Sequence, residues 1–124
     1  MIKIFLVGVG GFAGSIARYL IQLWVPHYPG AFPWGTFFVN ILGSLFIGII
    51  YGLAEEHKVM THEYRLLLAV GFCGSFTTFS TFSAENLQMM QLGAYGHLIT
   101  NLLLSVSLGI LAVISGIQLT RFFI

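Results

Sequence analysis

The segment Gly71-Phe-Cys-Gly-Ser-Phe-Thr-Thr-Phe-Ser-Thr-Phe-Ser-Ala-Glu85 places alternating hydroxyl groups and aromatic rings inside an apolar region of the chain. If the segment is helical, its phenylalanines fall along one face: Phe72, Phe76, Phe79 and Phe82. Hydroxyl groups and any broken backbone need hydrogen-bonding partners that lipid does not offer. The segment is therefore predicted to face protein or water, and it is our first candidate for a transport path.

The composition is that of an integral membrane protein. Of the 124 residues, 57% are hydrophobic and 7% are charged, and Asp is absent. The five basic residues form no basic field for nucleic acid, and the single Cys73 cannot form an internal disulfide. The apolar run that follows Lys3 is about twenty residues long, which is too long for the core of a signal peptide, so we expect a retained membrane helix.

Four membrane spans are predicted in one all-α domain that covers residues 1–124 and has no separate soluble part. Their approximate bounds follow the apolar runs: 2–24, 34–53, 64–90 and 97–123. Each run is long enough to cross a hydrocarbon core of about 30 Å. A proline-rich loop joins the first two spans, and aromatic residues typical of a membrane interface bracket it: Trp24, Tyr28 and Trp34.

The few basic residues give a modest orientation preference. Four of them lie toward one face, which favours cytoplasmic termini: Lys3, Lys58, Arg65 and Arg121. Only Arg18 lies toward the other face of the membrane. Because four spans of this length enclose little interior, oligomerisation is expected on size alone.

Small residues at close-packing spacing predict tight helix contacts: Gly10 and Gly14, Ser44 and Gly48, and Gly109 and Gly116. We expect these contacts within one chain more often than between chains. The glycine-rich run 8–14 resembles a nucleotide-binding loop only superficially, because no strand precedes it and no acidic residue follows.

Three polar side chains within the spans need a partner or a function. Asn40 has two N–H donors that suit an anion, and an interhelical hydrogen bond is the competing interpretation. Arg18 either snorkels to the interface or raises the anion concentration in a vestibule. Glu85 is interpreted first as an interfacial anchor, with a role in transport as the less favoured alternative. The histidines lie in loops or at span ends, show no metal-ligand spacing and are expected to be solvated: His27, His57, His62 and His97.

A track of hydroxyl groups is the next part of the anion-pathway hypothesis. Thr78, Ser80 and Thr81 lie in the opening segment. Ser105 and Ser107 lie in the fourth span and cannot both face the same way on a helix. One of them is expected to bond its own backbone and the other to join the track, and the sequence leaves this choice open.

Phe79 and Phe82 differ from the other phenylalanines because hydroxyl groups flank them closely. An aromatic ring has a negative face and a positive edge, so ring edges can accept an anion without a fixed positive charge. Together with hydroxyl and amide donors, these edges would replace the water around a small anion. A Lys or Arg in the same place would bind too tightly for the ion to leave.

The opening segment resembles the signature of the Fluc (CrcB) family of fluoride channels. The segment Trp34-Gly-Thr-Phe-Phe-Val-Asn-Ile-Leu-Gly-Ser44 and the pattern Gly-Gly-x-x-Gly-x-x-x-Arg18 are similar to that family too, and the resemblance covers the whole chain. It implies an antiparallel, dual-topology homodimer with two fluoride pores in the inner (cytoplasmic) cell membrane. Such a channel exports fluoride passively and protects the cell from its toxicity.

The same resemblance implies roles for individual residues. Phe79 and Phe82 supply ring edges at each pore, and Asn40 is the amide donor. The polar track is lined by Thr78, Ser80, Thr81 and either Ser105 or Ser107. The third helix of the family is broken at its centre, where freed backbone carbonyls bind a structural sodium ion at the centre of the dimer. The matching positions are Gly74 and Thr77.

Three other classes of protein compete with the channel. A small proton-coupled drug exporter, also four-span and dimeric, is the main alternative, but it needs a membrane-embedded carboxylate. Glu85 is the only acidic residue near a span interior. A packing subunit without transport would leave Asn40 beside the hydroxyl–phenylalanine track unexplained. An enzyme is not expected, because the sequence has no Ser–His, metal or paired-carboxylate pattern.

Overall fold

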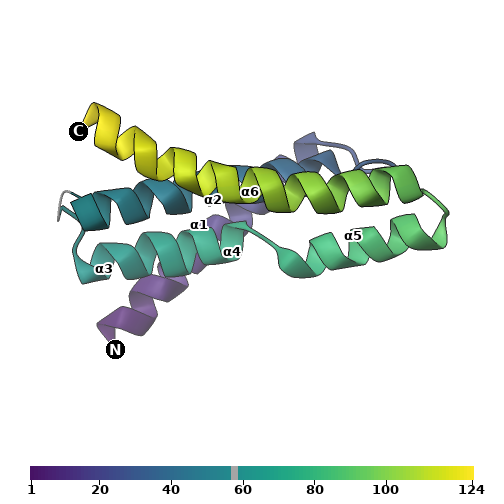
Figure 1. Ribbon diagram of the computed structural model, residues 1–124. Helices are drawn as coiled ribbons and strands as arrows, with labels where there is room; N and C mark the ends of the chain where they lie inside the picture. Colours follow the sequence, from purple (N-terminus) through teal and green to yellow (C-terminus); the bar gives the residue numbers. More distant parts are fainter. Residues whose placement is uncertain (57–58) are drawn as a thin grey trace.

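The computed structural model describes residues 1–56 and 59–124, and in this part of the chain four helices are long and apolar enough to cross a membrane. Three of them are continuous: α1 (Ile2–Trp24), α2 (Trp34–Glu56) and α6 (Tyr95–Phe123). The third span consists of four pieces: α3 (His62–Arg65), η1 (Leu66–Cys73), α4 (Gly74–Phe76) and α5 (Phe79–Gln91). Figure 1 shows both termini at the same end of the bundle.

Three of the four observed spans extend the predicted ones by one to three residues at one or both ends. α1 has the predicted bounds, whereas α2 continues to Glu56 and α6 begins at Tyr95. Helices often continue past the hydrocarbon core into the polar interface, where hydropathy no longer marks them. The all-helical, four-span fold is confirmed, and the dual-topology dimer stays a prediction. The predictions for His57 and Lys58 fall outside the described residues.

Two sets of helix contacts build the interior: α1 packs on η1 and α4, and α2 packs along α6. Both contacts need glycine, because the backbones approach too closely for a side chain. A Cβ at Gly10 would collide with the carbonyl oxygen of Leu67, and one at Gly48 with that of Val113. These glycines therefore serve packing within the chain.

The segment η1 is a π-helix, a form that appears mostly as short insertions in α-helices and frequently at functional sites. Just beyond it, the Ser75 hydroxyl lies 2.8 Å from the Gly11 carbonyl oxygen of α1, to which it can donate. This contact ties α1 to the third span directly before the span breaks.

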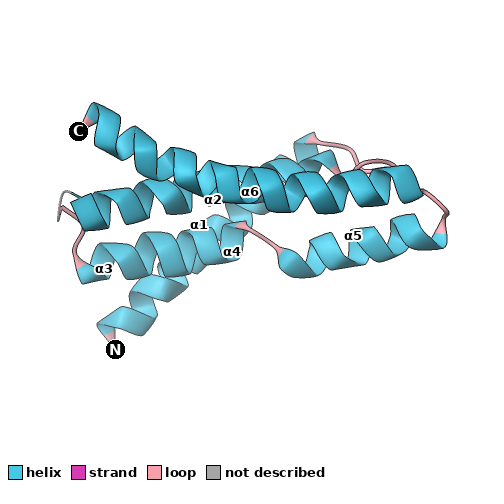
Figure 2. Cartoon of the chain, in the orientation of Figure 1, coloured by secondary structure: helices cyan, strands magenta, loops and turns pink. Residues whose placement is uncertain are grey.

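The break also divides the row of phenylalanines. Phe72 and Phe76 stack inside the bundle with ring centroids 5.5 Å apart, and Phe76 is only 1% exposed. Phe79 lies beyond the break and is 80% exposed. One continuous helical face therefore does not carry all four rings, because the chain is not helical between the two pairs. Figure 2 shows this non-helical link between α4 and α5 in the middle of the bundle.

Candidate functional site

The third span is interrupted at Thr77 and Thr78, both of which have extended backbone. Their φ and ψ angles are −78° and 156° for Thr77, and −146° and 115° for Thr78. A helix end leaves carbonyl groups without donors, and a helix start leaves N–H groups without acceptors. The interruption therefore places both kinds of backbone group midway along a membrane span, where lipid cannot satisfy them.

Asn40 of α2 bonds both backbone groups of Thr78. The Thr78 N–H donates to Asn40 Oδ1 at 2.8 Å, and Asn40 Nδ2 donates to the Thr78 carbonyl at 3.2 Å. In an unbroken helix this N–H would donate to the Gly74 carbonyl. The interhelical hydrogen bond considered for Asn40 is thus present, and Nδ2 carries a second hydrogen that this pair of bonds does not use.

Thr78 also begins α5. Its hydroxyl accepts a hydrogen bond from the Thr81 N–H at 3.2 Å, which is an N-cap arrangement. The same hydroxyl donates to the Thr81 hydroxyl at 3.1 Å and lies 3.4 Å from that of Ser80. Thr78, Ser80 and Thr81 therefore form one cluster at a helix N-terminus, where the helix dipole favours negative charge.

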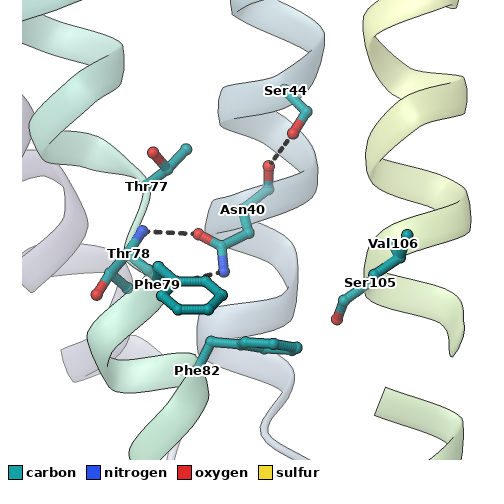
Figure 3. Close-up of a pocket in the computed structure, with 8 residues that line it drawn as sticks. All are labelled: Asn40, Ser44, Thr77, Thr78, Phe79, Phe82, Ser105 and Val106. Atoms are coloured by element: carbon teal, nitrogen blue, oxygen red, sulfur yellow. Dashed lines mark hydrogen bonds between the residues drawn. The ribbon is translucent and has the colours of Figure 1, made fainter. Parts of the chain in front are cut away.

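A cavity of about 290 Å³ lies beside the interruption, between α2, the third span and α6 (Figure 3). We call it the break cavity. Eight residues line it: Asn40, Ser44, Thr77, Thr78, Phe79, Phe82, Ser105 and Val106. None of these eight side chains is charged, so any ion in the cavity would meet only dipoles and aromatic rings.

The rings of Phe79 and Phe82 lie next to each other in the break cavity. Their centroids are 6.0 Å apart and their planes are inclined by 38°. Figure 3 shows both rings beside the Asn40 side chain. The two rings therefore border a cavity that also holds an amide and hydroxyl groups, which is the placement that the anion-pathway hypothesis needs.

The structure separates the two serines that the sequence left undecided. Ser105 lines the break cavity, and its hydroxyl donates to Asn101 Oδ1 at 3.0 Å. Ser107 is exposed and donates to the Leu103 carbonyl of its own helix at 2.6 Å. Of the two candidates, Ser105 is the one brought to the cavity, while a role in fluoride passage stays a prediction for both.

Ser80 and Thr81 line a second cavity, of about 490 Å³. His27 and Gln88 also border it, and His27 Nε2 lies 3.3 Å from Gln88 Oε1. The hydroxyl track is therefore shared between two cavities. Thr78 lines the first, and its hydroxyl contacts both track residues of the second.

Glu85, which also lines the second cavity, has a partner that sequence reasoning missed. Thr36 of α2 is only 3% exposed and donates to Glu85 Oε1 at 2.8 Å. Glu85 Oε2 is buried and has no hydrogen-bond partner among the described residues. Glu85 as a whole is half-buried, and its interpretation as an interfacial anchor stays a prediction. Thr36 lies four residues before Asn40 on the same helix, so helical spacing could have drawn attention to it.

Arg18 of α1 reaches the interruption from outside the break cavity. It is partly buried, and its Nη1 atom lies 3.5 Å from the Thr77 carbonyl oxygen. The guanidinium therefore points at the carbonyl end of α4 instead of only toward the membrane interface. The vestibule role of Arg18 stays a prediction.

The two carbonyl groups expected to hold sodium both lose their helical partners at the interruption. In an unbroken helix the Gly74 carbonyl would accept from the Thr78 N–H, and the Thr77 carbonyl from the Thr81 N–H. Those N–H groups bond Asn40 Oδ1 and the Thr78 hydroxyl instead. Oxygen ligands of this kind suit a hard cation, so these two carbonyl groups are compatible with the predicted sodium ion. The Thr77 oxygen also lies 3.5 Å from Arg18 Nη1.

Comparison with known proteins gives a consistent result over almost the whole chain. The sequence model of the family described as "CrcB-like protein, Camphor Resistance (CrcB)" matches residues 5–117. A protein of Azobacteroides pseudotrichonymphae named "Fluoride-specific ion channel FluC" is 43% identical over 122 residues, which cover 98% of each chain. Proteins with the same name from Phocaeicola vulgatus and Leptospira interrogans are 44% and 41% identical over 122 residues. That length covers 98% of this chain in both cases, and 100% and 96% of the relatives.

Proposed function

The chain belongs to the CrcB-like family, and on this premise we propose that it is a fluoride-specific ion channel through which fluoride leaves the cell passively across the inner membrane. Its near-full-length relatives carry that channel name, which supports transport and not an enzymatic reaction. The observation that carries the proposal is the break cavity. Its eight lining residues include hydrogen-bond donors and aromatic rings, and none of their side chains is charged.

The donors in the break cavity are of a kind that replaces water around a small anion. Asn40 Nδ2 has a hydrogen that its bond to Thr78 does not use. Phe79, which lines the cavity, is the first residue of α5. Its N–H group has no carbonyl partner within the helix, and the helix dipole adds to its attraction for an anion. The edges of Phe79 and Phe82 provide weaker positive contacts.

Absence of charge among these lining side chains favours conduction over retention. A channel site must attract an ion enough to remove its hydration water, yet release it quickly. An opposite unit charge in a low-dielectric interior would hold a bare anion too strongly. Arg18 lies outside the break cavity, at the Thr77 carbonyl, where it would enrich anions without trapping them.

The proposal includes an antiparallel homodimer with two pores. It is supported by the position of Phe79, which borders the break cavity yet is 80% exposed in the single chain. The polar groups beside this ring are better covered by protein than by lipid, which offers them no hydrogen-bonding partner. A second, inverted chain would close the cavity, and aromatic rings of both chains would meet at each pore.

A structural sodium ion at the centre of this dimer is also part of the proposal. The carbonyl groups of Gly74 and Thr77 would hold it, and the exposed position of Gly74 leaves room for a second chain to approach. When bound, the ion would supply positive charge to carbonyl groups that the interruption leaves without helical donors.

Ion efflux from liposomes tests this function. Vesicles loaded with potassium fluoride or potassium chloride are given a potassium ionophore, and an ion-selective electrode follows the anion that leaves. Protein-containing vesicles should lose fluoride rapidly and chloride hardly at all, while protein-free vesicles keep both. Equal loss of the two anions would refute the selectivity. Uptake of a cationic dye driven by a pH gradient would instead favour the drug-exporter alternative.

A further inference from the structure

Two buried asparagines connect to the break cavity through Ser105. Asn101 of α6 is 1% exposed and Asn86 of α5 is 8% exposed. Asn101 Nδ2 donates to Asn86 Oδ1 at 2.8 Å, and Asn101 Oδ1 accepts from the Ser105 hydroxyl at 3.0 Å. The three side chains therefore form a ladder from the interior of the bundle to the cavity, and burial of two amides is costly unless they are paired.

In this arrangement the hydroxyl groups around the break cavity all donate to acceptors of the protein itself. Ser44 donates to the Asn40 carbonyl, and Thr77 to the Cys73 carbonyl. Thr78 donates to the Thr81 hydroxyl. Ser105 differs because its acceptor is a side-chain amide, which carries an acceptor on one side and a donor on the other. A backbone carbonyl can never donate, whereas a turned amide can.

We propose that Asn101 and Asn86 are positioning residues that turn the Ser105 hydroxyl toward a fluoride ion in the break cavity. A half-turn of the Asn101 amide would let its N–H donate to Ser105 Oγ and free the Ser105 proton for the cavity. The Asn101 oxygen would then face Asn86, which must turn as well to present its own N–H. The two amides therefore turn together, and the ladder keeps the same number of hydrogen bonds in both states.

This inference rests on the proposed function and adds to its selectivity. An anion can shift the equilibrium toward the turned state only by the difference between its binding free energies in the two states. Fluoride is a stronger hydrogen-bond acceptor than chloride, so it gains more from the freed Ser105 proton. Without the amide, Ser105 would bond back to its own helix as Ser107 does to Leu103, and its proton would be lost to the cavity.

Efflux from liposomes with a double-mutant cycle tests the inference. Asn101→Leu and Ser105→Ala should each lower fluoride efflux by about tenfold or more, as expected for loss of one hydrogen bond to a charged group. The double variant should be no slower than the slower single variant, because both changes remove the same proton. Thr100→Val, an exposed neighbour on α6, is the matched control and should conduct like the unchanged protein.

A purely structural ladder would give different results. Multiplicative effects in the double variant, or unchanged efflux in Asn101→Leu, would overturn the inference while leaving the proposed function standing. If the protein without any substitution conducts no fluoride, both the inference and the proposed function are overturned.

A measurement on the unchanged protein covers the case in which Asn101→Leu does not fold. The side-chain NH₂ signals of Asn86 and Asn101, observed by NMR after ¹⁵N-asparagine labelling, should shift with added sodium fluoride. The same concentration of sodium chloride should leave them in place, and Ser105→Ala should remove the response. Signals that do not move with fluoride would overturn the inference.

Discussion

Asn40 is the residue that both holds the interruption and offers a donor to the break cavity. Its amide accepts from the Thr78 N–H and donates to the Thr78 carbonyl. A carboxylate of the same size keeps the acceptor and loses the donor. It would also add a negative charge beside a carbonyl oxygen, at the place where an anion is proposed to pass.

For this reason we expect Asn40→Asp to lower the rate of fluoride efflux by about a hundredfold or more. This corresponds to an activation free energy that is higher by roughly 2.7 kcal/mol. Efflux from liposomes measures the effect, and gel filtration in detergent establishes that the variant is folded. Efflux at the unchanged rate would show that the amide has no part in the pathway.

The two cavity phenylalanines give a second prediction at this scale. Phe79→Ile and Phe82→Ile keep apolar volume but remove the positive ring edge, so each should lower fluoride efflux by about tenfold while the dimer persists. Phe5→Ile, an exposed position on α1, is the matched control. Unchanged efflux in both cavity variants would remove the rings from the mechanism.

At the scale of elements, the interruption of the third span is stabilised from both sides. The last carbonyls of α4 and the first N–H groups of α5 lack helical partners. Asn40 satisfies one N–H from the neighbouring helix, and the Thr78 hydroxyl satisfies another within α5. The pathway and the helix cap therefore depend on the same threonine.

Removal of the cap should be visible in stability. Thr78→Val keeps the shape of the side chain but loses the hydroxyl, and it should lower the free energy of unfolding by about 1 kcal/mol. Thr78→Ser keeps the hydroxyl and should be close to the unchanged protein. Thermal unfolding in detergent compares the two, and equal melting temperatures for both variants would contradict the capping role.

The contact between α1 and η1 gives a matched pair of glycines. A Cβ at Gly10 would meet the Leu67 carbonyl, whereas nothing lies within 4 Å of one at Gly8. We expect Gly10→Ala to lower the stability by about 1–3 kcal/mol. Gly8→Ala should leave the stability unchanged or raise it by up to about 1 kcal/mol, because alanine favours a helix. Thermal unfolding distinguishes them, and similar losses for both would contradict the close contact.

At the scale of the whole molecule, the single chain leaves functional groups uncovered. Phe79 is exposed beside the break cavity, and Gly74 is exposed at the end of η1. Within its own chain, a Cβ at Gly74 would meet only the Ala69 carbonyl oxygen, at an ordinary contact distance of 3.8 Å. This open backbone is the surface at which the proposed second chain would bind.

Gly74→Leu therefore tests the dimer. The single chain has room for a Cβ at this exposed position, whereas a closely packed partner would clash with a leucine side chain, so we expect the variant to fold and the dimer fraction to fall. Single-molecule photobleaching in liposomes counts the chains in each complex. Gly96→Leu, where a Cβ would have nothing within 4 Å, is the control. An unchanged dimer fraction in Gly74→Leu would place the interface elsewhere.

Much of the fold could be predicted from the sequence because a membrane constrains each segment separately. A span must be apolar and about twenty residues long wherever its neighbours lie, and this was enough to predict the four helices. The motifs around Asn40 and Phe79 likewise indicated the family and the chemical types in the cavity. Local hydroxyl spacing also marked Thr78, which proved to cap α5.

Tertiary structure alone decided which side chains meet. It brought Ser105 to the break cavity in place of Ser107, assigned Ser80 and Thr81 to a second cavity, and paired Asn86 with Asn101. These outcomes depend on how each helix is rotated about its axis and on where the third span changes direction. The hydropathy of a segment predicts neither its rotation nor its change of direction, because both arise from contacts between residues that are far apart in the chain.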